Sequence, residues 1–184
     1  CTPMTSTTLA GSAVTFPAQG TWTVTQGSAV FGDIHSPLSD ASGLGVGENI
    51  LRWTVSNGPC EAGISFDEVT ITVFDSGNLT ANAGPDQSLC LPTTTTSMAG
   101  SAVIFPATGI WTLVTGTGVI TDPASPTTAI TGLSVGENVF QWSVMNGPCA
   151  NPSTSDFVSI FIYDDANAVA NAGNDQQICT PLTG

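Results

Sequence analysis

The chain repeats itself with a period of 89 residues. Cys1, Trp22, Trp53 and Cys60 recur in the same order, without a gap, as Cys90, Trp111, Trp142 and Cys149, and Cys90 recurs once more as Cys179. The strings GSAV, FPA, VGEN and NGPC keep the same spacing. A unit of this length is too long for a helical solenoid repeat and is close to the size of one small β-sandwich. We therefore expect modules that each have a hydrophobic core of their own.

Hydrophobic alternation predicts that these modules are built from β-strands. Residues 47–56 (GENILRWTVS) place Leu51, Trp53 and Val55 on one face, and residues 136–145 repeat the pattern. Each run is followed by Asn-Gly-Pro, which is strong turn chemistry, and then by a second alternating run, DEVTITVF or DFVSIFIY. The second run should pair antiparallel with the first. Thr, Ser, Gly, Val and Pro dominate the composition, so almost no helix is expected.

The predicted fold class is all-β, with tandem immunoglobulin-like (PKD-like) β-sandwich modules of about seven short strands each. We expect an Ig-like module at 1–79 that lacks its opening strand, a complete Ig-like module at 80–168, and the opening strand of a third module at 169–184. The matching strings CTPMTS and CTPLTG at the two ends suggest a window cut from a longer polypeptide. The strand phasing assigns Trp22, Trp53, Trp111 and Trp142 to the core.

Five cysteines phased with the repeat, beside a single histidine, predict disulfides and an oxidising location. Two pairings fit an odd count. Bonds within modules would join Cys1 to Cys60 and Cys90 to Cys149, and Cys179 would pair outside the chain. Bonds between modules would join Cys60 to Cys90 and Cys149 to Cys179, with Cys1 left over. The first scheme is favoured because each bond would close a loop of about 60 residues, which stabilises by about 4 kcal/mol.

The charge balance excludes several classes of partner. The chain has 14 Asp and Glu residues against one Lys or Arg, and its net charge is −13. Without basic residues it has no patch for nucleic acid or for anionic lipid. The sequence contains no apolar run of about 18 residues, so no direct membrane insertion is expected. One histidine and no lysine offer no recurring nucleophile and base, and we expect no enzymatic activity.

Calcium is the one cofactor that the sequence suggests, at the joints between modules. Hard oxygen ligands gather around each predicted linker: Asp75, Asn78, Asn82 and Asp86 at one, and Asp164, Asp165, Asn167, Asn171 and Asp175 at the next. The alternative is that Asp and Asn gather there because they suit turns. A DxDxDG calcium loop is absent from the sequence.

Several motifs together resemble a known type of repeat. NAGPDQSLC at 82–90, GLSVGENVFQWSV at 132–144, NGPC and the closing DFVSIFIYD are similar to PKD-like or Ig-like modules that occur in tandem in very large surface proteins of Bacteroidetes. These include gliding-motility-associated adhesins exported by the type IX secretion pathway. In that family a cysteine near the module opening commonly accompanies one in an Asn-Gly turn, so the resemblance supports Cys90 with Cys149.

The expected function is that of a structural repeat segment in a secreted, cell-surface adhesin or extracellular filament, acting as a load-bearing stalk. Its partners would be neighbouring modules, further chains in a fibre, and surface glycans. The alternative is a carbohydrate-binding or spacer module of a secreted polysaccharide-degrading enzyme, in which the four tryptophans would stack on sugars.

Overall fold

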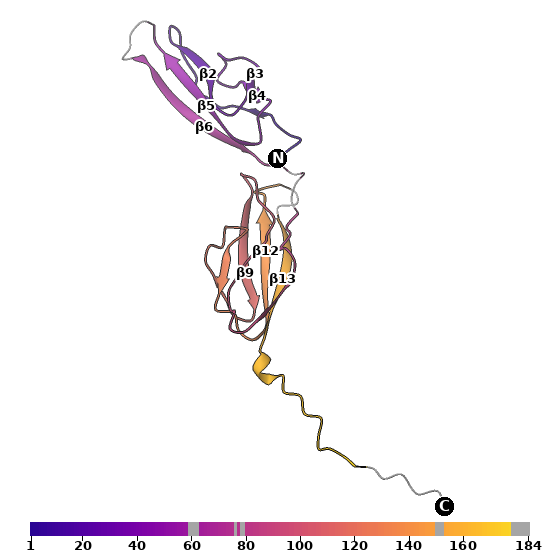
Figure 1. The fold of residues 1–184 in the computed structure, drawn as a ribbon. Coiled ribbons are helices and arrows are strands. Elements are labelled where there is room, and N and C mark those ends of the chain that lie inside the picture. The colour runs from indigo at the N-terminus through magenta and orange to yellow at the C-terminus, as the bar shows by residue number, and fades with distance from the viewer. Residues whose placement is uncertain (59–62, 76, 78–79, 150–152, 178–184) are drawn as a thin grey trace, which may run out of the picture.

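The computed structural model describes residues 1–58, 63–75, 77, 80–149 and 153–177, which form two β-sandwiches placed end to end (Figure 1). The first contains β1 (Thr7–Thr8), β2 (Gln19–Gln26), β3 (Val30–Phe31), β4 (Asp40–Ser42), β5 (Gly47–Ser56) and β6 (Ser65–Val73). The second contains β7 (Gln87–Cys90), β8 (Thr96–Ser97), β9 (Thr108–Thr115), β10 (Val119–Ile120), β11 (Ala129–Thr131), β12 (Gly136–Met145) and β13 (Ser153–Tyr163). A short 3-10 helix, η2 (Asp165–Asn167), follows β13.

Each sandwich has two sheets, and every described strand of the first sandwich recurs in the second, which adds β7. The first has the strand orders β1-β4-β3 and β2-β5-β6, and the second has β10-β11-β8 and β7-β13-β12-β9. All described pairs are antiparallel except β7 with β13, which are parallel. The fold class is therefore the predicted one, an all-β immunoglobulin-like sandwich occurring in tandem.

Two separate hydrophobic cores hold the sandwiches together. Trp22 and Trp53 face each other across β2 and β5, with ring centroids 5.0 Å apart, and lie in the first core. Trp111 and Trp142 repeat this pair across β9 and β12, again at 5.0 Å, and lie in the second core. No residue is common to the two clusters. Each module thus buries its own apolar residues, as expected for units of this size.

The two long strands that carry the alternation lie where the sequence predicted them. β5 spans 47–56 and β12 spans 136–145, and each pairs antiparallel with the strand after its Asn-Gly-Pro turn. In β13 the inward residues Val158, Ile160 and Ile162 are buried. In β6 the corresponding alternation is only partly buried, because the first sandwich has no described strand beside β6 to match β7.

A buried asparagine in each VGEN motif ties a loop to the sheet. The Oδ1 of Asn138 accepts hydrogen bonds from the Thr117 backbone N–H (2.9 Å) and the Ser134 hydroxyl, and its Nδ2 donates to the carbonyls of Ser134 (2.9 Å) and Ile160. Asn49 makes the corresponding bonds in the first sandwich. Sequence reasoning assigned these residues no role. The alternation puts Asn49 and Asn138 on the same face as Trp53 and Trp142, but it does not indicate the loop backbone groups that each amide bonds.

Replacing Asn138 by alanine should destabilise the second sandwich by about 3 kcal/mol, because the buried backbone donor and acceptors would lose their partner. Glu137→Ala is the control, since its exposed bond to Ser159 should be worth less than about 1 kcal/mol. Urea unfolding followed by tryptophan fluorescence measures both. Equal losses for the two variants would contradict the role given to the buried amide.

Candidate functional site: the joint between the sandwiches

Several residues of the repeated motifs lie outside both hydrophobic cores, at the joint where the two sandwiches meet. The chain leaves β6 at Phe74 and Asp75, and the NGPC turn of the second sandwich, residues 146–149, follows β12 at the same joint. Cys1 also lies here, because the Thr2 N–H donates to the Phe74 carbonyl (2.9 Å) beside the end of β6. Figure 1 shows the N-terminus between the two sandwiches.

A disulfide crosses this joint. Cys1 is bonded to Cys149, with Cα atoms 5.7 Å apart and a sequence separation of 148 residues. It links the beginning of the first sandwich to the last hairpin turn of the second. The bond therefore holds two adjacent modules together instead of closing one module on itself.

This pairing corrects both schemes considered from the sequence. β7 runs parallel to β13, so that Cys90 lies beside Tyr163 at the end of β13, whereas Cys149 precedes its start. Because β13 has 11 residues, the two cysteines lie about 30 Å apart, and a disulfide needs Cα atoms within about 7 Å. The Cys90 thiol is free and exposed. Cys60 and Cys179 lie outside the described residues.

The NGPC turn forms a socket for the end of β6. The Nδ2 of Asn146, which is buried, donates a short hydrogen bond to the Asp75 carbonyl. Gly147 has a φ of 55°, and a Cβ added there would lie 2.5 Å from the Phe74 ring. Glycine thus both adopts the left-handed backbone conformation and leaves room for the ring. Asn, Gly and Cys of the motif each contact the preceding module.

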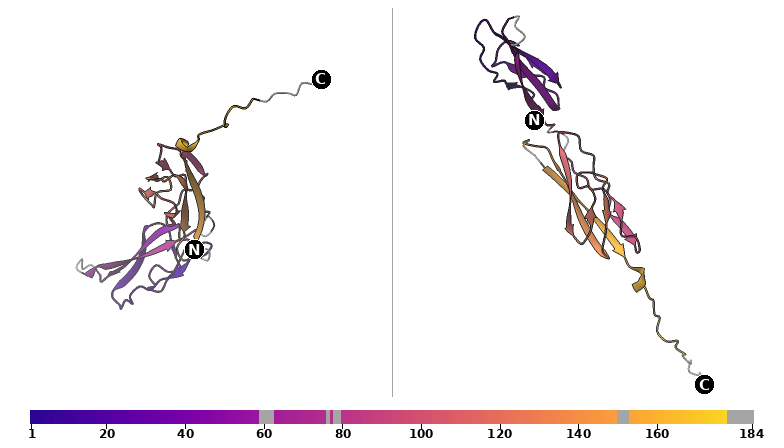
Figure 2. Two further views of the ribbon diagram at one scale, coloured as in Figure 1. Left: turned by 90° about the horizontal axis from the view of Figure 1, so that it is seen from below. Right: turned by 90° about the vertical axis from the view of Figure 1, so that its left-hand side faces the viewer.

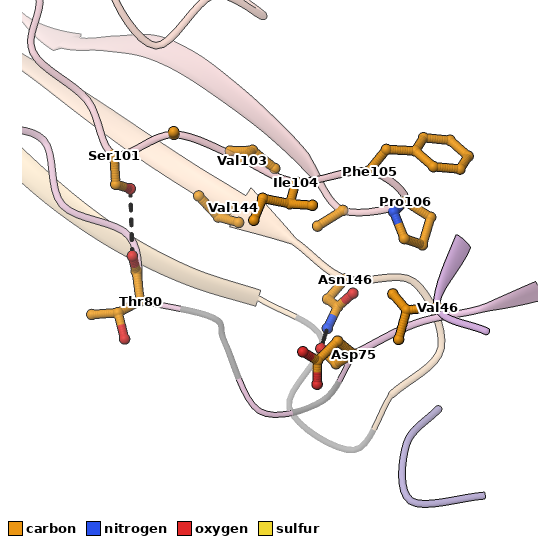
Figure 3. Close-up of a pocket in the computed structure, with 12 residues that line it drawn as sticks. Val46, Asp75, Thr80, Ser101, Val103, Ile104, Phe105, Pro106, Val144 and Asn146 are labelled. Atoms are coloured by element: carbon orange, nitrogen blue, oxygen red, sulfur yellow. Dashed lines mark hydrogen bonds between the residues drawn. The ribbon is translucent and has the colours of Figure 1, made fainter. Parts of the chain in front are cut away.

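A cavity of about 240 Å³ lies beside this socket (Figure 3). Val46 of the first sandwich and the apolar side chains of Val103, Phe105 and Val144 contribute to its walls. Asp75 is the one ionisable residue among the described residues that line it. A nucleophile with an adjacent base is not found in that lining. The cavity therefore lies between the two modules and is walled mainly by apolar side chains.

Five of the predicted calcium ligands accept hydrogen bonds from other groups of the chain. Asp75 Oδ1 accepts from the Thr2 hydroxyl (3.1 Å) and from the Gly77 N–H, and Asp164 caps η2. Asn82 and Asn171 each accept from the N–H two residues on, and Asp86 accepts from the Ser159 N–H. Asp165 and Asp175 are exposed. Across the described residues no three Asp, Glu, His or Cys side chains gather closely enough to hold a metal. Asn78 is not described, and calcium stays a prediction.

The four tryptophans do not form a sugar-stacking surface. Trp22, Trp53, Trp111 and Trp142 are all buried in the two cores. A stacking platform for sugars needs an exposed ring face, which a buried indole does not offer.

Comparisons with known proteins agree with the class of fold and go no further. No family model and no curated protein match the chain. A PKD domain from the KIAA 1837 protein is 25% identical over 56% of this chain and 99% of that one, with a TM-score of 0.41. Fibronectin(III)-like modules of Clostridium thermocellum CbhA are 13% identical over 92% of this chain and 100% of theirs, with a TM-score of 0.32.

A third solved structure is a SusE-like, surface-located polysaccharide-binding protein from the heparin utilisation locus of Bacteroides thetaiotaomicron. It is 12% identical over 78% of this chain and 29% of its own length, with a TM-score of 0.34. Because these TM-scores are low, the fold assignment rests on the strand pairing described above.

Proposed function

We propose that this chain is a non-catalytic structural segment of an extracellular surface protein or filament, in which β-sandwich modules are joined end to end and carry load. The observation that supports this most directly is the Cys1–Cys149 bond across the joint. A bond in this position serves the connection between modules more than the stability of either core.

The path that a pulling force would take supports the proposed load-bearing role. With Cys1 bonded to Cys149, tension applied at the two chain ends passes through the disulfide and bypasses both the linker and the first sandwich. Asn146 and Phe74 add a close-packed contact at the same joint, so bending is resisted as well as extension. An exposed Cys90 occupies the position that Cys1 holds one repeat earlier, which suits a chain of modules linked in the same way.

The proposed division keeps modules at 1–79 and 80–168, with the opening strand of a third at 169–184. The disulfide supports an oxidising, extracellular location, because such bonds are rare in reducing compartments. Among the described residues no helix is long and apolar enough to cross a bilayer. Binding to surface glycans stays a prediction, because no described feature of the chain selects a sugar.

An antibody raised against the chain tests the location and the shape. It should label intact cells that make the protein, and electron microscopy of the released protein should show thin rods with one bead per module. Labelling that requires cell lysis would contradict the extracellular role. Compact particles with no rod would contradict the filament.

A further inference from the structure

The NGPC turn at the joint contains an asparagine followed directly by a glycine, and this pair is chemically labile. An asparagine side chain loses ammonia when the backbone nitrogen of the next residue attacks its Cγ atom. Glycine has no Cβ and therefore hinders this attack least. Asparagine is for this reason counted among the thermolabile residues of proteins. Asn146 and Gly147 form such a pair at the place where the two sandwiches meet.

The contacts of the joint require both residue types. The Nδ2 of Asn146 donates to the Asp75 carbonyl, and an aspartate of the same shape could not do so, because a carboxylate has no hydrogen to donate. Gly147 has a φ of 55°, and a Cβ at this position would lie 2.5 Å from the Phe74 ring. The geometry that closes the joint thus selects an Asn-Gly pair.

The closed joint also protects this pair from reaction. Asn146 is 2% exposed, so water has little access to its side chain. The Nδ2 atom that would leave as ammonia is the same atom that is bonded to the Asp75 carbonyl. The reaction therefore cannot proceed without breaking a contact between the two modules.

The joint can open while both modules stay folded. The two hydrophobic cores share no described residue, and the sandwiches meet end to end, with the N-terminus at their junction (Figure 2). When a local opening is fast and reversible, a slow reaction of the exposed group proceeds in proportion to the open fraction. The Cys1–Cys149 bond and the Phe74 ring hold the joint closed and so lower that fraction.

We propose that Asn146 is a deamidation site, which the closed joint keeps unreactive and an opening of the joint exposes. The Gly147 nitrogen attacks Cγ of Asn146, the bond from Cγ to Nδ2 breaks, and ammonia leaves with the proton of the Gly147 N–H. A cyclic succinimide remains. Water then opens this ring at either carbonyl, which leaves aspartate or isoaspartate at position 146. The proposal rests on the contacts of the joint and does not depend on the extracellular role.

Deamidation would prevent the joint from closing again. The new carboxylate would face the Asp75 carbonyl, which has lost its donor, and the Asp75 side chain lines the same cavity (Figure 3). The chain has one Lys or Arg residue, Arg52, and its guanidinium is paired with Glu68 in the first sandwich. A charge buried at the joint without a partner opposes closure. An opening that lasts long enough for the reaction therefore becomes permanent.

Peptide mapping by mass spectrometry, after storage in a mildly alkaline buffer, tests the protection. Asn146 should deamidate at least about 100-fold more slowly in the folded oxidised chain than in the same chain unfolded in guanidinium chloride. Cys1→Ser and Phe74→Ala, with free thiols alkylated, should each raise the rate in the folded chain about 10-fold, because each removes a group that holds the joint closed.

Phe66→Ala is the matched control for Phe74→Ala. It removes a ring of the same size near the opposite end of β6, where the side chain is 60% exposed, and it should leave the rate at Asn146 unchanged. Tryptophan fluorescence checks that both sandwiches are folded in each variant. An equal rate in the folded and unfolded chains, or a rate that neither Cys1→Ser nor Phe74→Ala raises, would overturn the proposal.

Asn146→Asp tests the consequence, since it places the reaction product in the chain from the start. It should lower the equilibrium constant of the Cys1–Cys149 bond against a glutathione buffer at least about 5-fold, because the Asp75 carbonyl loses its donor. Asn57→Asp adds the same charge to the NGPC turn of the first sandwich, where the side chain is exposed, and it should leave the constant unchanged. Equal constants for the two variants would overturn the permanent opening.

Discussion

Pulled from its two ends in a single-molecule force experiment, the oxidised chain should release far less length than the reduced chain. The Cys1–Cys149 bond excludes the 148-residue span from extension. Only the residues after Cys149 can then be drawn out, or about 130 Å of contour at about 3.6 Å per residue. After reduction both sandwiches can unravel, and the accessible contour of the 184 residues rises to about 660 Å.

The number and size of the unfolding steps should also differ between the oxidised and the reduced chain. The reduced chain should show two unfolding steps of about 300 Å each, one per module. The oxidised chain should show one small step, as β13 is peeled from β12. Cys1→Ser supplies the control, since it should behave as the reduced chain does without any reductant. Two full-length steps from the oxidised protein would mean that the bond does not lie in the force path.

The sequence was sufficient to predict the two modules but not the disulfide that joins them. Strict alternation around Trp53 and Trp142, together with Asn-Gly-Pro turns, predicted β5 and β12 with their residue bounds. The repeat also indicated a strand in the second unit that has no described counterpart in the first. These features are local, so they can be read from a short window of residues.

The disulfide could not be predicted because it depends on the direction of one short strand. Cys90 and Cys149 would be neighbours if β7 ran antiparallel to β13, but β7 is parallel and carries Cys90 to the opposite end of the sandwich. Hydrophobic alternation is the same for both directions. The loop-closure argument for a bond within the module likewise ignores where the ends lie in space.

The contacts of the NGPC turn with the end of β6 could not be predicted from the sequence for a related reason. Asn146 and Gly147 were correctly interpreted as turn residues, and that interpretation accounted for their types without a further role. Their contacts with Asp75 and Phe74 join segments about 70 residues apart. The signal that could have revealed them is the cysteine in the same motif, because a turn alone does not require Cys149.

Gly147→Ala should weaken the joint between the two modules, and Gly58→Ala is the matched control. Both glycines occupy the same motif with positive φ, 55° and 68°, so alanine brings a similar backbone strain of about 1–2 kcal/mol to each. At Gly147 the new Cβ would also meet the Phe74 ring at 2.5 Å, whereas at Gly58 it would meet no atom of the described residues within 4 Å. The difference between the two variants therefore measures packing at the joint.

The readout is the equilibrium of the Cys1–Cys149 bond against a glutathione buffer, followed by mass spectrometry. Overpacking of about 1–3 kcal/mol should lower the equilibrium constant for Gly147→Ala by about 5- to 150-fold, while Gly58→Ala leaves it unchanged. Adding Phe74→Ala to Gly147→Ala should restore part of the loss, because the smaller side chain removes the contact. If Gly58→Ala shifts the equilibrium as much, or if Phe74→Ala restores nothing, the Phe74 ring does not hold the modules together and the disulfide acts alone.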